Sequence, residues 1–547
     1  MPVIAFHRFV LCLVLGFGLT VAHAQVCAPP ASLTNATASG IVNNYYAGNG
    51  NLSGGSTSLT LGATDTRVPA VTLAVGDLLL VMQMQDASIN TSNNNTYGNG
   101  SGSGSGSTSV GRSGLFEFVR VTSLGASVGF TPALTNSYTQ LAATATNAQK
   151  TYQVVRVAQY ASLTANGITA PAWNGSTGGV AVVDVQNTST LANGTVEGMT
   201  NRAFFLAGKG FRGGAGRGLG VSGGAFTDYA SLSTAGFHAS KAEGIAGTPF
   251  DVATLTSNWG FKATNPPAIT RPTAPATIEG YPNGSYAAGA PANGGGGGSD
   301  GNSNVNDENA GGGGGGNYGQ GGVGGRPWNS PLRDTGGRGG SGYAGTLAFN
   351  RIFMGGGGAG GTNNSTADAA TYLNNGISCS LGTGLCSSGA PGGGVIVIRA
   401  RSITGTGVID VRGAHGYNVA NDAGGGGGAA GSVIVQTNDG GNATVDAFGG
   451  DGGNAWGAQA GGLGDRHGPG GAGGGGFVAY SPASFGLVAN VNGGESGITL
   501  SGANRENYGS SGFNGGISNF QTPNIPGSPP AAQCDPNLSL TKTDGLT

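Results

Sequence analysis

The chain has 547 residues, of which 114 are glycine; charged residues make up only 9%, and the formal net charge at pH 7 is −2. This weak charge argues against a nucleic-acid partner, which requires clustered Lys and Arg, and the 37% of hydrophobic residues argues against a disordered chain. The glycines follow no G-X-Y period, so collagen is excluded.

The first 24 residues are predicted to be a signal peptide. Arg8 precedes an apolar stretch from Phe9 to Val21, and the small-residue motif AHA follows, with cleavage expected after Ala24. A membrane anchor is the alternative, but the stretch is short for a span. No later segment is long and apolar enough to cross a bilayer. We therefore expect a secreted protein, extracellular or at the cell surface, without a membrane span after cleavage.

Four cysteines remain in the mature chain: Cys27, Cys379, Cys386 and Cys534. An even number in an exported protein predicts disulfides, and four cysteines allow three pairings. Cys379 and Cys386 bracket a glycine-bearing loop, and pairing them would leave Cys27 with Cys534 to join the two ends of the mature chain. Four free thiols or a zinc site are the alternatives, although no CxxC pair supports zinc.

Residues 25–150 are predicted to form a small N-terminal β domain. Val75–Ala87 and Gly114–Ser123 carry apolar bursts with alternation, which is typical of strands. In the second of these, Phe116 and Phe118 share one face. The intervening Asn90–Ser109 is rich in Asn, Ser and Gly and is predicted to be a flexible loop that does not pack.

Residues 151–533 are predicted to form a glycine-rich repetitive β domain, with an insertion at about 213–390. Each copy of the repeat has an apolar strand, a gap, a second strand and then glycines; the copies begin at Tyr152, Gly178, Pro391, Gly431 and Gly476. No helical period appears in the mature chain. The predicted fold is all-β, with a repetitive β-sandwich or β-solenoid after the N-terminal domain.

The glycine runs need an energetic explanation, because ordering glycine costs more backbone entropy than ordering any other residue. One explanation is that backbones without Cβ atoms pack closely, as polyglycine II segments or as loops laid over a sheet, and pair their N–H and C=O groups. The alternative is that the runs are flexible loops. Their recurrence beside strand pairs favours packing.

Several long strings, among them GDLLLVMQMQDASINTSN, VVRVAQYASLTANGITAPAWNGSTGGV and FMGGGGAGG, resemble a family of exported, glycine-rich bacterial surface proteins that is largely uncharacterised. The resemblance covers about Gly40 to Gly494 and implies a localisation more than an activity. Members often continue into immunoglobulin-like repeats of the DUF11 type. Residues 534–547 resemble the first strand of such a domain; a strand donated to a neighbouring subunit is the alternative.

No catalytic constellation stands out. Asp410 and Arg412 share a strand face with His415 beyond them, as a β-helix lyase would arrange acid and base, but a surface ion pair beside a loop histidine is the favoured interpretation. Two glycine-rich strings resemble phosphate-binding loops without matching the P-loop pattern. Their basic residues, Lys209, Arg212 and Arg217, are expected on the surface of the repeat.

Two candidate binding sites follow from composition. Asp300, Asn302, Asn304 and Asn306 place oxygen atoms at alternate positions, with Asp307 next, as calcium loops do. The turn glycine and the bidentate glutamate of such loops are missing, so a polar turn is the alternative. Candidate sugar-stacking residues are four tryptophans near glycine, which equally suit a thin core: Trp173, Trp259, Trp328 and Trp456.

Taken together, these features predict a non-enzymatic structural or adhesive protein of the bacterial surface, a fibre subunit or an adhesin stalk that self-associates into filaments or a surface layer. Calcium is the only cofactor with any sequence support, and polysaccharide is a candidate partner. The alternatives are a carbohydrate-binding or carbohydrate-cleaving β-helix and a passive matrix component.

Overall fold

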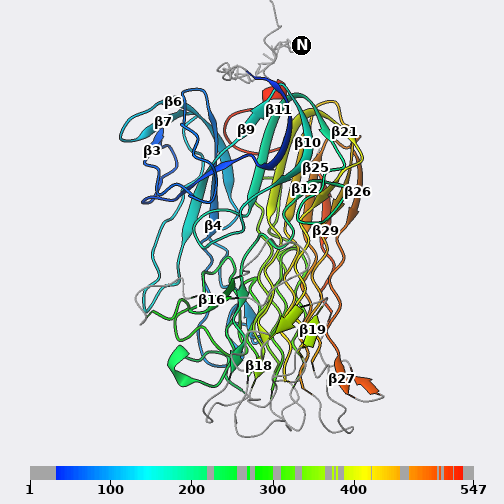
Figure 1. Ribbon diagram of the computed structural model, residues 1–547. Coiled ribbons are helices and arrows are strands. Elements are labelled where there is room, and N and C mark those ends of the chain that lie inside the picture. Colours follow the sequence, from blue (N-terminus) through cyan, green and yellow to red (C-terminus); the bar gives the residue numbers. More distant parts are fainter. Residues whose placement is uncertain are drawn as a thin grey trace, which may run out of the picture.

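The computed structural model describes most of the chain after residue 32. The described ranges are 33–218, 227–254, 268–270, 278–299, 309–326, 336–363, 372–374, 377–379, 387–419, 422–455, 467–501, 504–506, 511–520 and 523–533. Strands occupy the upper half of the molecule in Figure 1, and extended tracts with little regular secondary structure run side by side through the lower half.

A six-stranded antiparallel sheet forms the N-terminal part of the upper half. Its strands, in spatial order, are β2 (Asn44–Ala47), β8 (Thr151–Arg156), β4 (Leu78–Gln85), β6 (Phe116–Ser123), β7 (Val128–Thr131) and β3 (Ser58–Leu59). Alternate residues enter two cores: Leu79 and Val119 pack in a small cluster within this region, while Leu80 and Phe118 enter the main core. The strands predicted around β4 and β6 are confirmed.

A twelve-stranded sheet, in which every pairing is parallel, curls into a nearly closed barrel-like form beside it (Figure 1). Six strands form a first layer: β9 (Ala158–Tyr160), β11 (Val180–Leu191), β21 (Val395–Gly405), β23 (Ser432–Thr437), β25 (Phe477–Ser481) and β29 (Gly516–Asn519). Six form a second: β1 (Asn35–Ile41), β10 (Ser162–Thr169), β12 (Arg202–Phe205), β22 (Val408–Asp410), β24 (Asn442–Asp446) and β26 (Gly486–Asn490). The carboxyl half of β11 joins the layers by pairing with β10.

The register of these strands follows the sequence repeat. In the first layer Val182, Val397, Ile434 and Ala479 lie in line across β11, β21, β23 and β25, and all four are buried. In the second layer each later copy contributes its second strand, as β22, β24 and β26. The first copy differs, because its opening strand, β8, belongs to the antiparallel sheet. Each later copy thus crosses both layers before it enters its glycine tract.

Short elements complete the described chain. They are β13 (Gly213–Gly214) with β15 (Val252–Thr254) and β16 (Ala268–Thr270), β14 (Arg217–Gly218) with β18 (Thr362–Asn363), β5 (Ser105–Gly106) with β17 (Ala290–Pro291), β19 (Tyr372–Asn374) with β20 (Ile377–Cys379), β27 (Thr499–Ser501) with β28 (Asn504–Glu506), and the 3-10 turns η1 (Ser233–Ala235) and η4 (Ala531–Gln533). The all-β prediction is confirmed. In the described part of the chain, no helix has the length and apolarity to cross a membrane.

The polar loop Asn90–Ser109 differs from its prediction. It packs against the glycine-rich half through β5 and through Tyr97, whose ring is fully buried. The prediction of a loop that does not pack is therefore wrong. The loop is held both by backbone hydrogen bonds within it, such as those between Asn90 and Gly98, and by residues nearly 200 positions later, such as β17.

Candidate functional site: the glycine bundle and its charged contacts

The glycine tracts of the lower half form a hydrogen-bonded bundle. Gly311–Gly316, here called the central tract, is buried throughout. Its N–H groups donate to three other tracts and its carbonyls accept from three more, so that it has six neighbours: residues 322–325, 424–427 and 293–296 as acceptors, and 337–340, 471–474 and 356–359 as donors. Every backbone N–H and C=O group of the central tract is thereby paired, as buried backbone requires.

The bonding repeats every three residues. Positions 311 and 314 donate to one neighbour, 312 and 315 to a second, and 313 and 316 to a third. A period of three residues per turn, without hydrogen bonds inside the tract, is the geometry of a polyproline-II-type helix, which polyglycine adopts when its groups bond between chains. Gly424–Gly428 behaves in the same way, with bonds to six segments at residues 312–315, 359, 390, 414, 450–453 and 468–471.

Space rather than dihedral freedom makes glycine necessary in these tracts. None of the glycines of the central tract has a positive φ, so other residues could adopt their backbone conformation. A Cβ atom on Gly314, however, would lie 1.8 Å from the carbonyl oxygen of Ala472, and one on Gly311 would lie 1.9 Å from that of Pro469. The central tract is therefore packed so closely at these positions that a single methyl group has no room.

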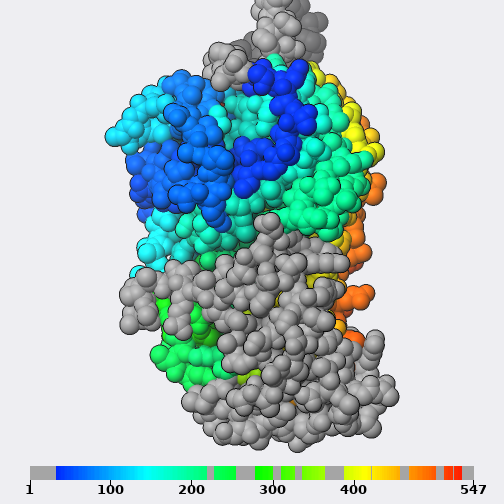
Figure 2. Space-filling model, in the orientation of Figure 1, coloured from blue at the N-terminus to red at the C-terminus, as the bar shows by residue number. Residues whose placement is uncertain are grey.

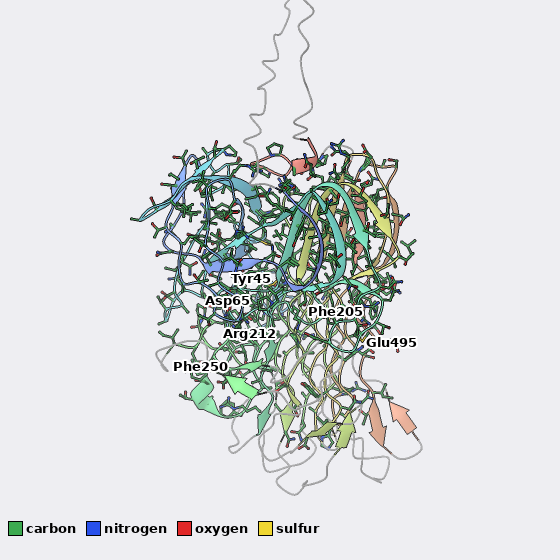
Figure 3. All side chains as sticks on the ribbon, turned by 45° about the horizontal axis from the view of Figure 1, so that its top comes forward. Tyr45, Asp65, Phe205, Arg212, Phe250 and Glu495 are labelled. Atoms are coloured by element: carbon green, nitrogen blue, oxygen red, sulfur yellow. The ribbon has the colours of Figure 1, made fainter. Side chains whose placement is uncertain are left out.

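A buried ion pair connects the bundle with the antiparallel sheet, where the Gln85 amide of β4 also donates to Glu243 at 3.4 Å. The Glu243 carboxylate, which is fully buried, accepts hydrogen bonds from the Arg212 guanidinium at 2.7 and 2.8 Å, from the Trp173 indole N–H at 3.1 Å and from the Thr248 hydroxyl. We call these four residues the Glu243 cluster. Figure 3 places Arg212 where the strands give way to the glycine tracts.

The electrostatics of the Glu243 cluster favour the charged pair. Burial by itself would raise the pKa of Glu243, but the charge and hydrogen bonds of Arg212 outweigh burial and hold that pKa below its ordinary value. The backbone of Glu243 also accepts from the N–H of Gly357, within a glycine tract. The cluster thus ties a glycine tract to the antiparallel sheet through a charge that is paired.

Lys241 is a second buried charge in the same region. Its Nζ donates to the carbonyl oxygens of Tyr229, Ala287 and Gly289, and lies 4.4 Å from the centroid of the Tyr97 ring. Burial lowers the pKa of Lys241 well below its ordinary value. The Lys241 side chain therefore holds two backbone segments, at Tyr229 and at Ala287–Gly289, and the polar loop together.

The Asp410–Arg412 pair predicted from the sequence exists, but it is buried rather than on the surface. Arg412 donates to Asp410 at 2.7 to 3.0 Å, and the Arg202 Nε lies 2.9 Å from the same carboxylate. Arg202 also reaches Asp446, whose pKa is raised by burial and by the charge of Asp410. A carboxylate enclosed by two guanidinium groups serves the fold, because its lone pairs are already engaged.

The histidines lie apart from this network. The Nδ1 atom of His415 is 3.1 Å from a carboxylate oxygen of Asp451, in the bundle. His467 is buried 4.0 Å from the Asp422 carboxylate, and burial lowers its pKa to about 3. The Nε2 atom of His238 lies 3.0 Å from Asp228. In the described part of the chain, no group of three His, Cys, Asp or Glu side chains could hold a metal ion.

Most of the predicted site residues lie outside the described residues. This holds for the calcium candidates Asp300 to Asp307, for Cys27, Cys386 and Cys534, and for Trp259, Trp328 and Trp456. Cys379 ends β20, but its side chain is not described. Trp173 is only 2% exposed, and its ring packs edge-on to Phe211. This residue belongs to the core, not to an exposed stacking face.

Sequence reasoning missed Glu243 and Lys241 and misplaced Arg212, which is buried rather than on the surface of the repeat. The signal was present in the string HASKAEGIAGTPF, which sets two charged residues among small and apolar ones. Isolated charges in such surroundings are costly to bury and therefore mark paired positions.

The chain stands alone in comparisons with known proteins. No family model, no curated protein and no solved structure matches it.

Proposed function

We propose that the protein is an exported structural element of the bacterial surface, a fibre subunit or an adhesin stalk. The observation that carries the proposal is the complete pairing of the central tract with six neighbours. Because the central tract consists of glycine, it has no side chains that could move aside. All of its N–H and C=O groups are already paired, so none is free to bond to water. Such material resists local opening, which is the property that an extracellular stalk needs.

Composition and charge support the same proposal. The chain carries few charges, and several of those described are spent on buried pairs such as Glu243–Arg212 and Asp410–Arg412. The amino-terminal segment predicted to be a signal peptide supports export. The resemblance to glycine-rich surface proteins supports a location at the cell exterior.

Hydrogen exchange of the purified mature protein tests whether the glycine tracts resist local opening. We expect the amides of the central tract to exchange as slowly as those of Val395–Ala400 in β21 and those of β23, because all are buried and paired. Rapid exchange throughout the glycine tracts would show that they are loose tethers and would overturn the proposal.

Electron microscopy of the same sample tests the assembly. We expect filaments or sheets if the protein is a fibre subunit. Monodisperse particles at high concentration would contradict the fibre subunit and leave only the stalk, for which the exchange result is then decisive.

A further inference from the structure

Hydroxyl groups lie in line across four neighbouring parallel strands. Thr37 of β1 is in register with Thr164 of β10, Thr164 with Thr190 of β11, and Thr190 with Thr404 of β21. A second row, two residues earlier on each strand, consists of Asn35, Ser162, Thr188 and Ser402. We call the two rows the hydroxyl array.

The array faces outward. Thr37 and Thr404 are exposed, and Thr164 and Thr190 are partly exposed, while the alternate residues Leu163 and Ile403 point into the core. Its upper part lies on the face shown in Figure 2, where β1, in dark blue, borders the teal strands. The hydroxyls of Thr188 and Ser402 lie 3.0 Å apart and those of Thr190 and Thr404 3.4 Å apart, so each row continues from β11 to β21.

Part of the array forms a shallow recess of about 280 Å³. It is lined by the first three strands of both rows, together with the intervening residues Ala36 and Leu163. None of the eight residues that line it is charged or aromatic. A charged ligand would find no partner in this lining, whereas a neutral ligand rich in hydroxyl groups would find donors and acceptors on both sides.

We propose that the recess binds a neutral polysaccharide whose chain runs across the strands. Neighbouring strands are about 4.8 Å apart and alternate residues about 6.6 Å apart, so the array repeats its hydroxyls at about the length of one sugar ring. Each ring of an extended chain meets an equivalent threonine as it passes from β1 to β11. The recess is concave, whereas a lattice of ordered water would match a flat surface. The concave shape therefore favours a polysaccharide over ordered water.

Affinity electrophoresis of the mature protein tests this site. The gels contain hydroxyethyl cellulose, dextran, laminarin or galactomannan, with polygalacturonate as the acidic comparison. We expect at least one neutral polymer to retard the protein. We expect the triple variant Thr37→Val, Thr164→Val, Thr190→Val to lose that retardation at least tenfold, because valine keeps the branched shape and removes the hydroxyl.

The matched control is Thr444→Val, which removes an outward hydroxyl of the same layer on β24, away from the recess. The Thr444→Val variant should bind the polymer as the wild type does, and it should melt at the same temperature as the wild type. The proposal is overturned if none of the four neutral polymers retards the wild type, if the triple variant binds as well as the control, or if only polygalacturonate binds. Inhibition of ice recrystallisation that the triple variant loses, without retardation in any neutral gel, would assign the array to ordered water and also overturn it.

Discussion

The two halves of the molecule solve the same packing problem in opposite ways. In the parallel sheet each residue of an inner strand pairs with at most two neighbouring strands, and side chains such as Val397 and Ile434 fill the main core. In the bundle the central tract bonds to six neighbours, and there is no space to fill. The sheet is therefore stabilised chiefly by apolar burial, and the bundle chiefly by backbone hydrogen bonds.

This difference predicts opposite responses to a change in volume. The sheet half loses stability when a methyl group is removed, because a cavity remains. The bundle half loses stability when a methyl group is added, because the contacting atoms are backbone and cannot turn away. The buried charges at the junction belong to neither regime, since their stability depends on pairing.

The largest expected effect comes from the junction. Glu243→Gln removes the charge that compensates the buried Arg212 and should lower the free energy of unfolding by about 3–5 kcal/mol. Denaturant titration with guanidinium measures this loss. Glu495→Gln, at an exposed position, is the control and should change stability by less than about 0.5 kcal/mol. Equal effects would show that Glu243 contributes no more than a surface residue.

The next effect breaks the bundle itself. Gly314→Ala introduces a Cβ atom against the carbonyl of Ala472 and should cost about 3 kcal/mol, the upper end of the range for overpacking. The control is Gly345→Ala, where nothing lies within 4 Å of the added atom. A difference of less than about 1 kcal/mol between the two variants would mean that the tracts spread apart easily.

A loss of stability at acidic pH distinguishes the buried His467 imidazole from the other contributions to stability. The pKa of His467 is about 3 in the folded state, below the ordinary value near 6.5 of the unfolded chain, so below pH 6.5 the unfolded state binds the extra proton. Stability should fall by about 1.4 kcal/mol per pH unit as the pH drops from 6.5 towards 3, which makes about 2 kcal/mol at pH 5.

The variant His467→Gln removes this titration and should flatten the pH dependence of the melting temperature. A smaller slope remains from His238, whose pKa burial also lowers. An unchanged slope in His467→Gln would contradict a neutral, buried His467.

The smallest expected effect comes from a substitution in the parallel sheet, which can be compared with the substitution in the bundle. Ile434→Val deletes one methylene group in the first layer and should cost about 0.5–1.5 kcal/mol. Thermal unfolding of this variant beside Gly314→Ala compares one carbon atom removed with one added. A larger loss in Ile434→Val would reverse the order that we expect.

Local sequence patterns predicted the strands but not the partners of the glycine tracts. The apolar bursts at Val395–Ile398 and Val408–Val411 coincide with β21 and β22, because β-branched residues bounded by glycine have few other uses. By contrast, nothing local shows that Gly312 donates to Gly424, 112 positions later. The glycine tracts resemble one another locally, so their composition does not show which of them will pair.

The Glu243 cluster could not be predicted from the sequence for a related reason. Trp173, Arg212 and Glu243 come from three separate segments that meet only in the folded chain. A lone glutamate gives no hint of which arginine it will find. The prediction for the polar loop with Tyr97 failed for the same reason. The composition of a loop indicates its own flexibility but does not show which distant residues it will contact.

The threefold period of the central tract gives each glycine run a phase. An insertion of three residues leaves every later N–H group pointing at the same neighbour, whereas an insertion of one or two turns the rest of the run towards the wrong ones. Relatives of this protein should therefore vary the length of their tracts in steps of three. Substitution offers them little variation there, because every alternative to glycine brings a side chain.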